Sequence, residues 1–259
     1  MLIIHYIKLF IGAFHDKHSY VHVALEEKGY FIKYLAFIVA ICSIPLYLKS
    51  YFDFNKYMKY EGLSLIEKLP ELYFEHGQVF LEEALPLEIN EGNSSIIIDS
   101  SNTYLNVLDS KADLLIRPRE MQIKLDGIAS RIAFDAFHDM RLNSKTIKNS
   151  IPWVKWILTL VFILSLIFQV VFYYLFCYAL AFLGNTLNNI YTVGLDKQAL
   201  IRISILAIGP MLFLDLLIRI FDVNIGGLGI LSFLMPALFI YIGIQANAEH
   251  IEDNKPNLS

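Results

Sequence analysis

The stretch that decides the fold runs from Trp156 to Leu195 and reads WILTLVFILSLIFQVVFYYLFCYALAFLGNTLNNIYTVGL. None of its 40 residues is Asp, Glu, Lys or Arg, whereas about 20 apolar residues suffice for a helix to cross a bilayer. The glycine and amides that begin at Gly184 are typical of a helix end. We therefore expect one membrane-spanning helix at 153–183, followed by a polar loop.

Three further stretches are apolar enough to form membrane helices. The chain of 259 residues is 56% hydrophobic and only 18% charged, against about 25% charged residues in an ordinary soluble domain. Its mean hydropathy of +0.51 is also typical of a membrane protein. The predicted spans are residues 30–52, 153–183, 199–221 and 225–246.

The basic residues predict how the helices are oriented. Four lysines between Lys8 and Lys33 precede the first span, and Lys197 and Arg202 flank the loop after the second. Because short cytoplasmic segments are enriched in Lys and Arg, we expect both termini, including the tail at 247–259, to be cytoplasmic. The opposite orientation stays open, since long loops are translocated regardless of their charge.

The segment between the first two spans has the composition of a water-facing domain. Residues 50–150 contain 11 Lys+Arg and 16 Asp+Glu, and short apolar runs alternate there with turn residues. We expect a small exoplasmic α+β domain at 53–150 with a mostly antiparallel sheet, and a helical segment from Ile128 to Met140. Asp99 ends an apolar run and precedes two serines, so it is predicted to cap a turn.

The first 29 residues form a separate segment. Aromatic residues such as Tyr6 and Phe10 alternate there with polar ones such as Lys8 and His15. This pattern predicts an uncleaved amphipathic helix at 1–29 that lies in the membrane interface. The predicted fold class is thus a membrane protein with four transmembrane helices, an N-terminal interfacial helix and an α+β exoplasmic domain inserted between helices one and two.

Two groups of residues stand out as candidate sites. His18, His22 and Glu26 share one face of a helix at a spacing that suits metal ligands. A solvated helix face explains the same pattern, and we expect neither a metal nor another cofactor. Asp215 and Arg219 lie four positions apart inside a predicted span. They form either a structural ion pair, with Arg219 reaching out toward Asp222, or a proton or ligand site.

The motifs that would indicate other kinds of chemistry are missing from the sequence. There is no G-x-S-x-G, P-loop, C-x-x-C or dinucleotide-binding fingerprint, so the chain is not expected to be an enzyme. The net charge of −4 and the lack of basic clusters argue against binding to nucleic acids.

The order of several short motifs resembles a family of bacterial membrane proteins of unknown function, some of which are labelled maltodextrin-utilisation proteins. The motifs are Glu27-Lys28-Gly29-Tyr30, Leu69-Pro70-Glu71-Leu72, His76-Gly77-Gln78-Val79, Pro86-Leu87-Glu88-Ile89, Ile96-Ile97-Ile98-Asp99, Gly209-Pro210 and Pro236. The resemblance implies four membrane helices and an exoplasmic domain, and it implies no established activity and no catalytic residues.

Two functions fit these features. One is a non-catalytic accessory or sensor protein whose exoplasmic domain binds a ligand or partner, with a link to sugar utilisation. The other is a small-solute permease or a permease subunit. Besides the lipid bilayer, the expected partner is another membrane or envelope protein, or a second copy of the chain.

Overall fold

The computed structural model describes residues 2–27, 31–80, 86–92, 94–101, 103–110, 112–125, 127–135, 139–223 and 227–253. The chain forms two compact units. We call the unit made of Met1–Ser50 and Leu160–Ser259 the helical bundle, and the unit Tyr51–Thr159 the sheet domain. The second unit covers nearly the same residues as the domain predicted at 53–150, and the exoplasmic location of that domain stays a prediction.

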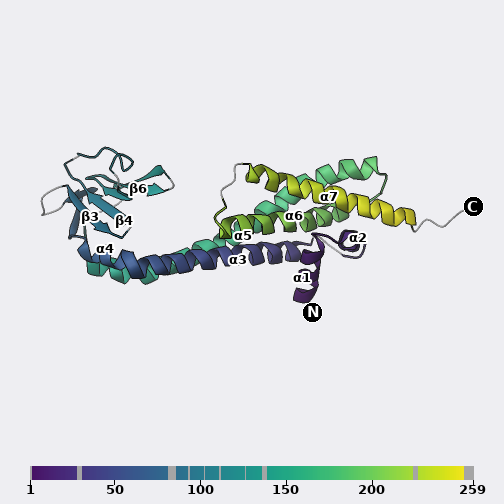
Figure 1. Ribbon diagram of the computed structural model, residues 1–259, viewed down its shortest axis with the longest axis horizontal. Coiled ribbons are helices and arrows are strands. Elements are labelled where there is room, and N and C mark those ends of the chain that lie inside the picture. Colours follow the sequence, from purple (N-terminus) through teal and green to yellow (C-terminus); the bar gives the residue numbers. More distant parts are fainter. Residues whose placement is uncertain are drawn as a thin grey trace, which may run out of the picture. The chain divides into compact units, whose positions relative to one another are not determined.

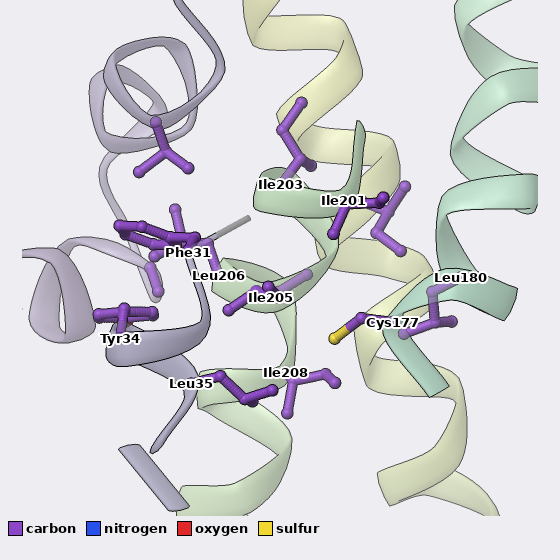
Figure 2. Packing of buried hydrophobic residues seen from close by; sticks show 14 of the residues in the cluster. Phe31, Tyr34, Leu35, Cys177, Leu180, Ile201, Ile203, Ile205, Leu206 and Ile208 are labelled. Atoms are coloured by element: carbon purple, nitrogen blue, oxygen red, sulfur yellow. The ribbon is translucent and has the colours of Figure 1, made fainter. Parts of the chain in front are cut away.

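The helical bundle is built around one central helix. It contains α1 (Leu2–Gly12), α2 (Lys17–Leu25), α6 (Lys197–Ile220), α7 (Leu228–Asp253) and parts of α3 (Ile32–Tyr57) and α5 (Ser144–Ile190). Every residue of α6 from Ala199 to Leu212 is buried. Figure 1 shows α7 beside α6, and Figure 2 shows isoleucines of α6 packed among Tyr34 of α3 and Cys177 of α5. Because a helix that is apolar on all sides needs apolar surroundings, α6 lies in the middle of the bundle.

Among the described residues, three helices are long and apolar enough to cross a membrane: α3 with its continuation to Lys68, α5, and α6. They overlap the first three predicted spans, and the first two helices extend beyond them. On α5 the large side chains of Phe168, Leu175 and Phe182 are more than half exposed, which is expected where the surrounding medium is lipid. These features fit a membrane protein with an additional sheet domain. The helix α7 overlaps the fourth predicted span at 225–246, and its crossing stays a prediction.

The helix α5 extends farther than the sequence predicts, because it ends at Ile190 and not near Leu183. Gly184 is a packing residue within the helix: a Cβ atom there would lie 3.4 Å from Ile240 of α7. The amide of Asn188 exchanges hydrogen bonds with the backbone of Leu195, at 3.0 and 3.2 Å. Glycine and asparagine are typical of helix ends, but here Gly184 lets α7 pack closely against α5, and Asn188 binds the backbone of the loop that follows α5.

The N-terminal segment forms two helices where one was predicted. Asp16 separates α1 from α2, since its side chain accepts a hydrogen bond from the backbone N–H of His18 and caps α2. The helix α2 packs against both α6 and α7. Its residues Tyr20 and Val23 are buried, and the Tyr20 hydroxyl donates to the Ala13 carbonyl at 2.8 Å. This helix belongs to the core of the bundle.

Besides parts of α3 and α5, the described residues of the sheet domain form a π-helical turn, one short α-helix and eight strands. These are η1 (Met58–Gly62), α4 (Leu63–Lys68), β1 (Leu72–Glu75), β2 (Gln78–Phe80), β3 (Leu87–Glu91), β4 (Ser94–Ile98), β5 (Leu114–Ile116), β6 (Glu120–Leu125), β7 (Ile128–Ala133) and β8 (Met140–Leu142). The strands form a three-stranded sheet in the order β2-β1-β8 and a five-stranded sheet in the order β3-β4-β5-β6-β7. All neighbours are antiparallel except β4 and β5. Figure 1 shows α4 next to β3.

The prediction of a mostly antiparallel sheet is confirmed. The prediction of a helical segment at 128–140 is wrong for the described residues of this range. This range contains β7 and the start of β8. Gly127, with φ of +80°, lies in the connection between β6 and β7, which then pair from Leu125↔Ile128 to Glu120↔Ala133. The glycine at a positive φ favours a hairpin, and strand pairing overrides the local helical spacing.

Candidate functional site

The described part of the sheet domain contains a hollow of about 450 Å³ over strands β3 and β4. It is lined by Glu88, Asn90, Ser95, Ile97, Tyr104, Asp109, Ser110 and Ala112. The pairs Glu88↔Ile97 and Asn90↔Ser95 are directly opposite each other across the two strands. Since side chains two positions apart on a strand share a face, these four residues form one wall of the hollow.

The opposite wall comes from the segment after β4. Its Tyr104 hydroxyl donates a hydrogen bond to Glu88 Oε1 at 3.1 Å, and this bond raises the pKa of the Tyr104 phenol. Buried Gln122 of β6 holds the same segment, because its Oε1 accepts from the Val107 N–H at 2.9 Å. The hydroxyl of Ser110 donates to the Val107 carbonyl at 3.0 Å. The second wall is thus anchored to the five-stranded sheet.

Asp99 positions Tyr104 in the hollow. The carboxylate is fully buried and accepts hydrogen bonds from the backbone N–H groups of Ser101, at 2.9 Å, and Tyr104, at 2.7 Å. Burial disfavours the ionised form, but these bonds and the one from the Ser101 hydroxyl outweigh it, so the pKa of Asp99 lies below its usual value. The predicted turn cap at Asp99 is confirmed.

The helical bundle has a separate polar cavity of about 480 Å³ between α3, α5 and α6. Its polar lining residues are Ser43, Tyr47, Ser50, Gln169, Tyr173, Asp215 and Arg219. The hydroxyl of Ser43 donates to Gln169 Oε1 at 2.9 Å and so links α3 to α5. Polar groups are few along each membrane helix, and packing gathers several of them into one place.

The predicted pair Asp215 and Arg219 lies on this cavity. Arg219 Nε is 2.9 Å from Asp215 Oδ2, and both side chains are partly exposed. The predicted approach of Arg219 to Asp222 is not seen. Asp222 instead pairs with Lys49 of α3 at 2.7 Å, while the same ammonium group donates to the Arg219 and Ile220 carbonyls at the end of α6. Lys49 therefore caps α6, as a cation at a helix C-terminus can.

Arg202 is a buried residue whose role could not be predicted from the sequence. From its position in the sequence, Arg202 was expected to flank the loop after the second span. Its side chain instead lies inside the bundle. Its Nε donates to the Val23 carbonyl at 2.8 Å, and its Nη2 donates to the Ala24 carbonyl at 2.7 Å. These carbonyls are in the last turn of α2, where the helix leaves acceptors without partners. The only signal in the sequence was that Arg202 lies near the start of an apolar helix.

The histidines of the N-terminal segment are arranged differently from the prediction. His22 Nδ1 lies 2.7 Å from Glu26 Oε2, as the helical spacing suggests. His18 is exposed and does not belong to this cluster. The residues that complete it are His5 of α1 and Glu27, whose Nε2 and Oε1 atoms are 2.7 Å apart. Sequence spacing could not find them, because His5 lies on another helix.

The chain matches the model of one protein family over residues 7–244, which is nearly its whole length. Neither the curated proteins nor the solved structures include a match to it. The family description states no function, so the function has to be inferred from the geometry of the sites. The chain belongs to the family described as protein of unknown function, DUF1189.

Proposed function

We propose that this protein is a non-catalytic accessory or sensor protein of the bacterial cell membrane whose sheet domain binds a small polar ligand on the exoplasmic side. The observation that supports it best is the hollow over β3 and β4, in which Tyr104 faces Glu88. Buried Asp99 and Gln122 hold the wall opposite the sheet through bonds to its backbone. A site whose walls are fixed before the ligand arrives loses less entropy on binding.

The side chains of the hollow favour a neutral, hydroxyl-rich ligand such as a sugar. The carboxylates of Glu88 and Asp109 accept hydrogen bonds, the amide of Asn90 both donates and accepts, and the Tyr104 ring offers an apolar surface. Two carboxylates in one hollow disfavour an anionic ligand. A link to sugar utilisation, which the family resemblance suggests, is part of the same proposal.

Maltose is the first probe for this site. Calorimetric titration of the full-length protein in detergent should show saturable binding, and both Glu88→Gln and Tyr104→Phe should weaken it at least about tenfold, or about 1.4 kcal/mol. The matched controls are Glu71→Gln and Tyr73→Phe, because these residues form a similar pair at 2.9 Å outside the hollow. Absence of binding, or equal losses in the control variants, would contradict a sugar site.

The orientation has its own experiment. Ser130 and Asp253 are exposed, whereas Cys42 and Cys177 are buried, so the native thiols give little background. In intact cells, Ser130→Cys should react with a membrane-impermeant thiol reagent, and Asp253→Cys should react only after the membrane is opened. The reverse pattern would place the sheet domain in the cytoplasm.

A partner in the membrane completes the proposal. The exposed apolar side chains of α5 suit lipid, and they also suit another membrane or envelope protein or a second copy of the chain. Crosslinking in native membranes, followed by mass determination, distinguishes a homo-oligomer from a complex with a different protein. If no crosslinked product of either kind forms, the result would argue against an accessory role.

A permease or permease subunit is the second candidate function, and the cavity between α3, α5 and α6 favours it. Transporters place polar groups of this kind near the middle of the membrane. Maltose uptake into proteoliposomes that contain the wild-type protein, abolished by Asp215→Asn and retained in Glu88→Gln, would support this function over the accessory role.

A further inference from the structure

Three metal-ligating atoms converge at the N-terminal end of the bundle. They are one ring nitrogen each from His5 and His22 and a carboxylate oxygen of Glu27, and all lie within 4.8 Å of one another. His5 Nε2 is 2.7 Å from Glu27 Oε1, and His22 Nε2 is 3.7 Å from the same oxygen. Tetrahedral ligands at about 2.0–2.1 Å from one zinc ion lie roughly 3.3 Å apart, so the ion would replace the His5–Glu27 hydrogen bond, and the three side chains would shift by about half an ångström.

Glu26 orients one of these histidines. Its Oε2 lies 2.7 Å from His22 Nδ1, the ring nitrogen opposite the one that faces Glu27. When the Nδ1–H group donates a hydrogen bond to a carboxylate, the lone pair of Nε2 is free to bind a metal ion. A carboxylate behind a ligating histidine is the usual outer-shell partner in zinc sites, where it fixes the ring and raises its basicity.

The backbone around the cluster is held independently of these side chains. Arg202 binds the Val23 and Ala24 carbonyls just after His22, and Asp16 caps the start of α2. The rings of His5 and His22 stand edge to face with centroids 5.7 Å apart. The two histidines come from different helices, so an ion bound by both would tie α1 to α2.

From this geometry we propose that His5, His22 and Glu27 bind a divalent transition metal ion, of which zinc is the expected example. Two imidazoles and one carboxylate are a zinc ligand set that leaves a fourth position for water or another ligand. Imidazole ligands disfavour calcium and magnesium, which prefer oxygen alone. The three residues are half-buried, so an ion can enter from solvent.

Zinc added to the full-length protein in detergent is the direct test. After removal of loosely bound ions, elemental analysis should find one zinc per chain, and cobalt in its place should give the visible absorption of a tetrahedral site. His5→Ala, His22→Ala and Glu27→Gln should each lower zinc affinity at least about 100-fold, and Glu26→Gln about 10- to 100-fold. The matched control is His18→Ala, on the same helix and outside the cluster.

Several outcomes would overturn the site. These are wild-type protein without stoichiometric zinc, zinc affinity unchanged by His5→Ala, or an equal loss in His18→Ala. Such results would leave the cluster as an ion-pair network only. His22 lies on the packed helix α2, so the circular dichroism of each variant is compared with that of the wild type. If His22→Ala does not fold, His5→Ala and Glu27→Gln still decide the matter.

Discussion

The helical bundle and the sheet domain place apolar and charged side chains in opposite ways. On the bundle, α5 exposes large apolar side chains such as Phe168 and Phe182, while the cation Arg202 is buried. In the sheet domain the apolar clusters lie inside, and the one buried aspartate among the described residues is Asp99. The bundle is thus arranged for lipid and the sheet domain for water.

Both buried charges are satisfied by the main chain. Carbonyl groups at the end of α2 accept from Arg202, and backbone N–H groups of a turn donate to Asp99. The backbone groups that lack partners determine the sign of the buried charge. Carbonyl groups at a helix C-terminus favour a cation, and N–H groups in a turn favour an anion. A buried charge is therefore tolerated in either unit where unpaired backbone groups surround it.

The largest effect is expected from a charge on the outer face of α5. Phe168→Arg should destabilise membrane insertion by about 2.5–3.5 kcal/mol, because a cation near the centre of a span is costly in lipid. The matched change in the sheet domain is Ile128→Arg, at a side chain exposed to a similar degree, and it should leave insertion and folding unchanged. Alkaline extraction of membranes measures the insertion of both variants. Equal extraction of the two would contradict a lipid-facing surface on α5.

Removing the buried cation should give the next largest effect. Arg202→Met keeps much of the side-chain volume but leaves the Val23 and Ala24 carbonyls without this donor, at a cost of about 1.5–3 kcal/mol in the free energy of unfolding. Arg202→Lys keeps the charge and loses the second donor, so its loss should be smaller. Thermal melting in detergent tests this order, and an unchanged melting temperature for Arg202→Met would refute the capping role.

The buried anion should show a pH dependence that the buried cation lacks. The folded pKa of Asp99 lies below its unfolded value of about 3.9, so its ionised form stabilises the sheet domain above that value. This contribution is lost as the pH falls through the folded pKa. Asp99→Asn should therefore cost about 1 kcal/mol at pH 7 and progressively less below about pH 4.

Urea unfolding followed by the circular dichroism of the strands measures this difference. Arg202→Met is the control, because arginine stays protonated throughout the range and its cost should not change with pH. A constant difference between wild type and Asp99→Asn from pH 7 to pH 3 would contradict an ionised, hydrogen-bonded Asp99.

The smallest effect is expected at the pair Asp215 and Arg219. Both side chains are partly exposed, so Asp215→Asn should lower the free energy of unfolding by no more than about 1 kcal/mol. Adding Arg219→Gln should recover part of this loss, since the unpaired cation is then removed as well. If Asp215→Asn melts like the wild type but loses solute uptake or a cellular phenotype, the pair is a functional site and not a structural one.

The sequence alone was sufficient for the features that depend on composition along the chain. The uncharged run from Trp156 predicted a helix long enough to cross a membrane, the charge density of 50–150 predicted a separate domain, and the short apolar runs of that segment predicted a mostly antiparallel sheet. Such signals are local, because hydrophobic burial and backbone pairing act on every residue of a segment in the same way.

Only the tertiary structure decided what individual polar residues do. Gly184 does not end α5, because α7 packs against it, and residues 128–133 pair as a strand although their spacing is helical. Arg202 meets carbonyls 178 and 179 positions away, and His5 joins Glu27 across two helices. Such hydrogen bonds and ligand sets depend on distances between atoms of different helices or strands. These distances cannot be inferred from the order of residues within one helix or strand.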